Sequence, residues 1–113
     1  MEISINNIRV IEVEVLREEM FKLIETHVDY MDMDQDKFVY LLGYYPAMYN
    51  YMSELYTFMI AQVRERMELS DKFGTARARD KRDILEQVLK SCKMQYDSLS
   101  RKITLFSDVE KRR

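Results

Sequence analysis

The sequence of 113 residues contains only two glycines and one proline. β-Rich domains need many tight turns, which these residues usually supply, so the scarcity predicts few, long elements. Tryptophan is absent, and the single cysteine, Cys92, excludes an internal disulfide and fits a reducing compartment. No apolar run approaches the ~18–20 residues of a bilayer span, and residues 1–5 lack the basic and apolar regions of a signal peptide. We therefore expect a cytoplasmic protein that does not enter a membrane.

Residues whose side chains commonly act in catalysis or bind metals in a recognisable pattern are also few. The one histidine, His27, falls on the apolar stripe of a predicted helix, which favours a structural role over proton transfer. Cys92 falls in a predicted helix seam, where a thiol is inert. The acidic run at 29–36 begins like a calcium loop but lacks the glycine and the final glutamate that such a loop requires. We expect no enzyme, no metal site and no cofactor.

The composition is that of a folded helical chain. Apolar residues make up 47% and charged residues 34%, which is typical of globular or coiled-coil proteins, and the length suits one domain spanning 1–113. Nine methionines and eight tyrosines are typical both of helix cores and of adaptable binding surfaces. The net charge of −2 hides an asymmetry, because residues 1–63 are acidic and residues 64–113 are basic. Halves of opposite sign favour contacts between subunits or a basic end for an anionic partner.

The pattern along the chain predicts four parts. Residues 1–15 are rich in β-branched side chains and partly alternate, which predicts a strand-like segment with a turn at Asn6-Asn7. Residues 16–45 predict short helices, the first at about 16–30 and the second ending near Gly43. A new helix is expected to start at Pro46 and, after a turn at 70–75 that contains Gly74, to be followed by another that ends near residue 106. Residues 46–106 thus form a long antiparallel helical hairpin, and 107–113 form a tail.

The second arm of this hairpin carries a heptad repeat. The first set recurs every seven positions: Leu85, Cys92, Leu99 and Phe106. The second set lies four positions after the first three of these: Leu89, Tyr96 and Ile103. Alternating steps of four and three are typical of a left-handed coiled coil. The predicted seam comprises Leu85, Leu89, Cys92, Tyr96, Leu99, Ile103 and Phe106.

The first arm carries two overlapping apolar rows, and only one of them can pack on the second arm. Met48, Met52, Leu55, Met59 and Leu69 follow one frame, whereas Tyr49, Tyr56, Ile60, Val63 and Met67 follow the neighbouring one. The helix at 16–30 or another subunit has to cover the remaining row, and broad apolar faces on thin hairpins favour a homo-oligomer. The candidate interface residues are Tyr44, Tyr45, Met48, Met52, Leu55 and Met59.

Basic residues gather around the hairpin turn. The local excess at 64–82 is not explained by helix stability, since cations at a helix N-terminus oppose the dipole. An anionic partner such as single-stranded nucleic acid accounts for them, and Phe73 offers a stacking surface. A charged, solvated turn accounts for them equally. The candidate nucleic-acid-binding residues are Lys72, Arg77, Arg79, Lys81 and Arg82.

A hairpin with tyrosines in its first arm, a basic turn and the closing run QYDSLSRKI at 95–103 resembles small bacteriophage recombination-mediator proteins. The resemblance covers about residues 38–106. It implies assembly into rings and the loading of a recombinase onto single-stranded DNA, with the basic turn as the contact region.

Taken together, the patterns predict a mainly α, non-enzymatic accessory or scaffold protein that oligomerises and acts by binding macromolecules. Two alternatives stay open. One is a single-stranded nucleic-acid binder that assists recombination, and the other is an inhibitor or adaptor that binds another protein.

Overall fold

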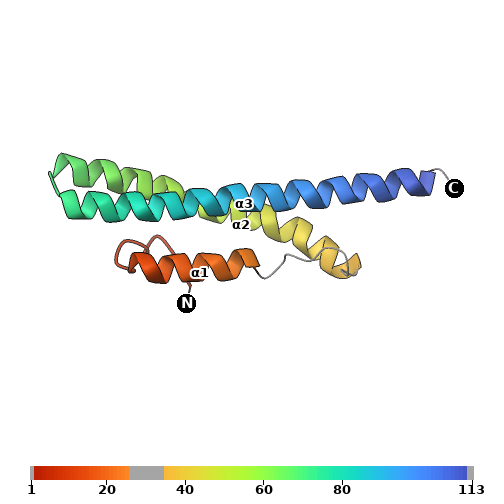
Figure 1. Ribbon diagram of the computed structural model, residues 1–113, viewed down its shortest axis with the longest axis horizontal. Helices are drawn as coiled ribbons and strands as arrows, with labels where there is room; N and C mark the ends of the chain where they lie inside the picture. The colour runs from red at the N-terminus through yellow and green to blue at the C-terminus, as the bar shows by residue number, and fades with distance from the viewer. Residues whose placement is uncertain (1, 26–34, 112–113) are drawn as a thin grey trace.

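The computed structural model describes residues 2–25 and 35–111, except for the side chains of 24, 25, 35, 37, 38 and 102–111. It contains three helices: α1 (Val13–Glu25), α2 (Gln35–Glu68) and α3 (Lys72–Lys111). The predicted helical hairpin is confirmed, since α2 and α3 run antiparallel and pack extensively on each other (Figure 1). The chain is 65 Å long and only 23 Å and 18 Å across, so every helix lies near the surface.

The alignment of α2 with α3 is fixed by an apolar seam. The Cys92 thiol donates to Met48 Sδ across 3.2 Å, which sets these two positions level. Seven residues towards the turn, Leu55 comes level with Leu85, and both side chains are fully buried. On α2 the buried positions step by four and three from Leu41 through Tyr45, Met48, Met52 and Leu55 to Met59.

The predicted seam of α3 has two columns, each made of residues seven positions apart. The first column is buried as expected, but other residues are buried in place of the second. Leu85, Cys92 and Leu99 are buried as the first column. The buried second column consists of Lys81 and Val88, which lie three positions after Ala78 and Leu85. Of the residues expected in this column, Leu89 is half-buried and Tyr96 is exposed. The side chains of Ile103 and Phe106 lie outside the described part of the chain. At Lys81 the N-terminal segment covers this column, because the ammonium group donates to Ile8 O and Arg9 O.

The N-terminal segment is not strand-like, and this expectation was wrong for residues 2–12. Ser4 O accepts hydrogen bonds from the backbone N–H groups of Asn7 and Ile8, and Asn7 O accepts from those of Val10 and Ile11. The Asn7 side chain holds the turns together by accepting from Ser4 N at 2.8 Å and donating to Glu2 O at 2.7 Å. An asparagine that satisfies local backbone groups in this way competes with strand pairing. Ile3, Ile8 and Ile11 are buried.

Helix α2 continues through Pro46, so the expected break into a short helix and a new helix is also wrong. Proline in a helix interior removes one hydrogen bond and costs about 3 kcal/mol. The apolar spacing runs on from Leu41 to Met48 across Pro46, and burial of these side chains offsets the cost. Three further limits differ: α1 starts at Val13, α3 starts at Lys72, and α3 extends to Lys111 instead of ending near 106. His27 lies outside the described residues.

The turn between α2 and α3 caps both helices. Asp71 N donates to Arg66 O and Ser70 N donates to Met67 O, both at 3.0 Å, which is the Schellman arrangement with Ser70 at the left-handed position (φ 57°). Asp71 Oδ1 then accepts from Gly74 N at 2.9 Å as the N-cap of α3. Gly74 therefore lies inside α3 and not in the turn, and a Cβ there would come within 2.2 Å of Asp71 Oδ2.

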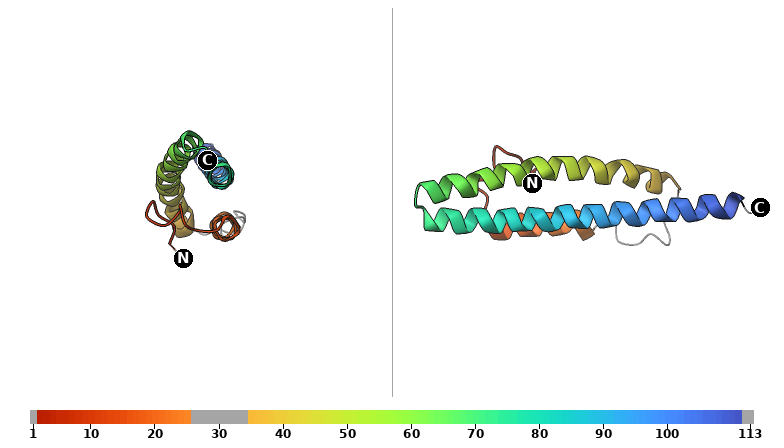
Figure 2. Two further views of the ribbon diagram at one scale, coloured as in Figure 1. Left: turned by 90° about the vertical axis from the view of Figure 1, so that its left-hand side faces the viewer. Right: turned by 90° about the horizontal axis from the view of Figure 1, so that it is seen from above.

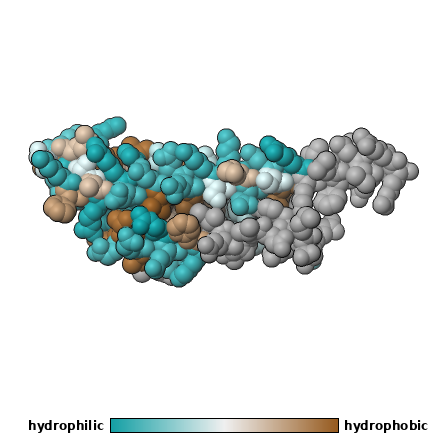
Figure 3. All heavy atoms as spheres, in the orientation of Figure 1, coloured by the Kyte–Doolittle hydropathy of each residue, from teal (hydrophilic) through white to brown (hydrophobic). Residues whose placement is uncertain are grey.

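Residues 2–25 lie together on one side of the hairpin, as the two views of Figure 2 show. Helix α1 packs against α3 through Leu16 and Met20, which are buried. Figure 3 shows the apolar side chains in a band between α1 and the hairpin, flanked by hydrophilic ones. None of the helices in the described ranges has an apolar stretch of the length that a bilayer span requires.

We predict that Ser70→Gly stabilises the protein by about 0.5–1 kcal/mol, because glycine adopts the left-handed conformation without the Cβ penalty. The midpoint of urea unfolding, followed by circular dichroism, measures this gain. Ser70→Ala keeps the Cβ and is the matched control, for which we expect no gain. Equal stabilities of the glycine and alanine variants would contradict the assignment of strain to Ser70.

Candidate functional site

No residue in the described ranges covers the side of the hairpin opposite residues 2–25. We call it the outer row: Tyr49, Tyr56, Ile60 and Met67 on α2, and Leu89 and Tyr96 on α3. Tyr49 and Tyr96 line one groove of about 430 Å³ beside Pro46. Tyr56 follows Tyr49 by seven residues and Leu89 precedes Tyr96 by seven, so in an antiparallel pair they also come level.

The outer row is partly open to solvent. Tyr49, Ile60 and Tyr96 are each 38–39% exposed, and Met67 is 55% exposed. Tyr56 and Leu89 are half-buried against the core. The four α2 residues belong to the second row predicted for the first arm, of which Val63 is buried instead. Leu89 and Tyr96 were expected in the seam of the second arm. Helix α1 does not cover the row, because it packs against α3 on the other side.

The expected interface residues are mainly the chain's own core. Tyr45, Met48, Met52, Leu55 and Met59 are buried, since they face α3 in the seam. Their burial corrects the assignment of these five positions to a surface between subunits. Tyr44 is half-buried, and burial, together with the neighbouring Tyr40, raises the pKa of its phenol.

A second groove runs between α1 and α2. Tyr44, Met48 and Met52 line it on the α2 side, opposite Met20 and Leu23 of α1. Its volume is about 380 Å³, and the Tyr51 hydroxyl donates to Ile3 O at its edge. The N-terminal segment therefore closes one end of this groove.

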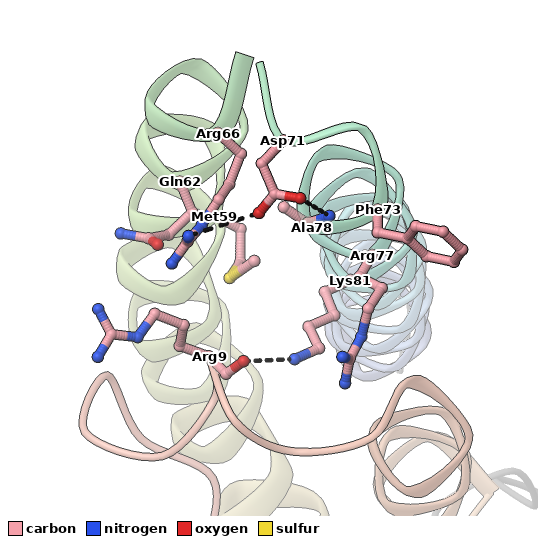
Figure 4. Close-up of a pocket in the computed structure, with 10 residues that line it drawn as sticks. Arg9, Met59, Gln62, Arg66, Asp71, Phe73, Arg77, Ala78 and Lys81 are labelled. Carbon is pink, nitrogen blue, oxygen red and sulfur yellow. Dashed lines mark hydrogen bonds and ion pairs between the residues drawn. The ribbon is translucent and has the colours of Figure 1, made fainter. Parts of the chain in front are cut away.

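A basic cavity of about 450 Å³ lies at the turn end of the hairpin. Figure 4 shows α2 and α3 on its two sides and the N-terminal segment below. Four cationic side chains line it, but only one acidic side chain does, namely Asp71. The four are Arg9, Arg66, Arg77 and Lys81. We call this space the tip cavity.

Lys81 joins the N-terminal segment to the hairpin. Its side chain is only 2% exposed, and its ammonium group donates to Ile8 O at 2.8 Å and to Arg9 O at 3.0 Å. Burial, with a contribution from the positive charge of Arg77, lowers the pKa of this amine. Lys81 is therefore no exposed cation that a strand passing over the surface can contact, which corrects its assignment to a surface for a nucleic-acid backbone, although it still lines the tip cavity.

The other candidate nucleic-acid-binding residues lie around the turn with different surroundings. Arg77 pairs with Glu12 at 3.5 Å, and Arg82 pairs with its neighbour Asp83 at 3.0 Å. Arg79 is exposed and contacts Met67 Sδ at 3.6 Å. Lys72 is exposed beside Phe73, which lies at the rim of the tip cavity and is 86% exposed (Figure 4).

Gln62 and Arg9 line the tip cavity but were not candidates from the sequence, and they differ in how visible they were. Gln62 continues the four–three spacing of the seam, as Lys81 does, so a polar residue at an apolar position was the available signal. Arg9 offered none, because its place depends on how the turns around Asn7 fold back onto the hairpin.

Neither a reactive thiol nor a metal-ligand cluster occurs among the described residues. Burial raises the pKa of the Cys92 thiol to about 11, so the thiol is protonated at neutral pH. Nowhere in 2–25 and 35–111 do three His, Cys, Asp or Glu side chains come together in a geometry that could hold a metal ion.

Comparisons of the chain with protein-family models, with curated proteins and with solved structures gave no match.

We predict that Lys81→Met destabilises the protein by about 2 kcal/mol at neutral pH, because two buried carbonyl groups lose a charged donor. The loss should be concentrated in the N-terminal segment. Hydrogen exchange is expected to accelerate at the amides of Ile8 and Ile11, while the amides of Leu55 and Leu85 stay protected. Uniform acceleration in all three segments would contradict this.

The same variant has a pH signature. Because the pKa of Lys81 is lowered in the folded state, the unfolded chain binds its proton more tightly. The contribution of Lys81 to stability therefore rises with pH in the window below its ordinary pKa of 10.5. The free energy of unfolding of the wild type should therefore exceed that of Lys81→Met by a margin that grows as the pH rises from 7 towards 10.5.

Proposed function

We propose that this is a non-enzymatic helical accessory or scaffold protein of the cytoplasm that self-associates and acts by binding other macromolecules. The observation that carries the proposal is the outer row, an apolar stripe that runs along both arms of the hairpin without cover from the rest of the described chain.

The chemistry of the row favours a protein partner over mere exposure to water. It combines aromatic and aliphatic side chains at steps of seven and four residues, which is the pattern that a further helix pair packs against. Tyrosine and methionine are enriched at protein interfaces, where the phenol hydroxyl tolerates a wet edge. Two copies that meet on this row would form a four-helix arrangement with the same seam geometry as α2 and α3.

We predict that light scattering gives a mass above the 13.7 kDa of one chain, rising with concentration towards a multiple of it. The double substitution Tyr49→Glu with Ile60→Glu should return the mass to one chain, because buried like charges oppose association. Both residues are partly exposed in the monomer, so the fold should be retained.

The matched control is Ala61→Glu, which places the same charge on α2 at an exposed residue outside the heptad frames of Tyr49 and Ile60. It should leave the mass unchanged. A wild-type protein that stays at the mass of one chain at the highest attainable concentration would refute self-association.

A second candidate function is binding of single-stranded nucleic acid at the turn end of the hairpin. It is favoured by the exposed cations Lys72, Arg77 and Arg79 beside the exposed ring of Phe73. Cations follow a phosphate backbone, and an aromatic ring stacks on bases of any sequence. This would agree with the resemblance to phage recombination mediators.

For this candidate we predict affinity for single-stranded DNA that falls steeply between about 50 and 200 mM salt. Arg79→Ala should weaken binding and reduce the slope of log affinity against log salt by about 1. Arg101→Ala, at an exposed position of α3 far from the turn, is the control and should change neither. Fluorescence anisotropy measures both variants, and undetectable binding at low salt would exclude this function.

A further inference from the structure

The tip cavity contains two buried polar groups with unused hydrogen-bonding capacity. Gln62 is 8% exposed and lines the cavity, and its Oε1 accepts no hydrogen bond from any described residue. Its Nε2 donates to Glu65 Oε2 at 3.3 Å, which fixes the amide so that the oxygen is the free end. A buried acceptor without a donor costs about 1–3 kcal/mol, so this oxygen is suited to a ligand that donates.

The second group is the Lys81 ammonium. It uses two of its three N–H donors on the carbonyls of Ile8 and Arg9, and no carboxylate of the described chain lies within ion-pair distance of it. A buried cation without an anion in contact is costly, and a ligand with negative charge would offset that cost.

The arginines around the cavity are held loosely. Arg66 reaches Asp71 and Arg77 reaches Glu12 through single contacts of 3.5 Å, longer than a good charge-assisted hydrogen bond. The Arg9 guanidinium has no hydrogen bond or ion pair with the described residues. These groups are free to turn towards an anion with more oxygens and more charge than one carboxylate, which is the chemistry of a phosphate.

The walls restrict how a phosphate enters. α2 and α3 flank the cavity, the N-terminal segment closes it below, and the turn with Asp71 lies above (Figure 4). A terminal phosphate, which is bonded to the strand on one side only, fits between such walls more readily than an internal one. The volume of about 450 Å³ is within the range of small-molecule sites.

We propose that the tip cavity binds a phosphate monoester. Its anionic oxygens pair with Arg66, Arg77 and Lys81, and a hydroxyl group on the phosphate or beside it donates to Gln62 Oε1. The monoester has two possible sources, a free nucleotide or the phosphorylated 5′ end of a nucleic-acid strand. The site requires neither self-association nor binding of an internal nucleic-acid backbone.

The test uses the full chain and two pairs of probes that differ only in the phosphate. Calorimetry compares adenosine 5′-monophosphate with adenosine. Fluorescence anisotropy compares a short single-stranded DNA carrying a 3′ label and a 5′ phosphate with the same strand carrying a 5′ hydroxyl. We expect the phosphorylated member of at least one pair to bind at least tenfold more tightly. Preference within the first pair alone identifies a free nucleotide, and preference within the second identifies a strand end.

Variants separate the cavity from general positive charge. Arg66→Gln and Gln62→Glu should each weaken binding of the phosphorylated probe at least tenfold, the first by removing a cation and the second by adding an anion. Gln62→Met removes the acceptor at similar volume and should cause a smaller loss. Arg64→Gln removes a charge from an exposed neighbouring position outside the cavity and should have no effect.

Three results would overturn the proposal: equal affinity within both pairs, no binding of any probe at low salt, or an equal loss with Arg64→Gln and Arg66→Gln. Thermal unfolding of each variant shows that a loss of binding is not a loss of fold. Self-association is measured separately by mass, so either proposal can fail while the other stands.

Discussion

The alignment of α2 with α3 is the constraint on which the other features depend. Met48 against Cys92, repeated at seven-residue intervals as Leu55 against Leu85, sets which residues of the two arms are level. It brings the outer row together on one side and places Lys81 against the N-terminal segment on the other. It also brings Arg66 and Gly74 so close at the turn that a Cβ at Gly74 would lie 3.0 Å from Arg66 Cδ. A slip of one residue would separate all three sets.

The described part of the chain covers one side of this seam and leaves the other side open. On one side, the turns around Asn7 and the apolar face of α1 bury Ile8, Leu16 and Met20 against the hairpin. On the other side, no described segment covers the outer row. A thin pair of helices cannot hide two lateral rows with a single short helix. The second row is therefore the surface that the proposed self-association would cover.

The sequence predicted the hairpin well because heptad spacing is a local signal that long helices preserve. It predicted the N-terminal segment poorly, since β-branched residues such as Ile3 and Ile8 favour strands only where a pairing edge exists. It also placed a break at Pro46, where burial on both sides of the proline outweighed its local cost. In α3 the alternating steps of four and three residues selected Leu89 and Tyr96 as buried seam positions. The neighbouring column at Lys81 and Val88 became the buried one because a remote segment covers it.

Lys81 shows why a charge pattern alone misassigns function. In the sequence it belongs to a basic run that suits a phosphate backbone, yet in the fold its ammonium satisfies two carbonyl groups and is hidden from a strand. The spacing held an unused signal for this outcome, because a lysine at a seam position must either be buried with partners or disrupt the seam. Gln62 follows the same logic on α2, one seam step after Met59. Two polar residues placed where a coiled coil needs apolar ones leave the seam incomplete at the turn. The cationic space between them is the part of the molecule that packing of the chain on itself does not explain.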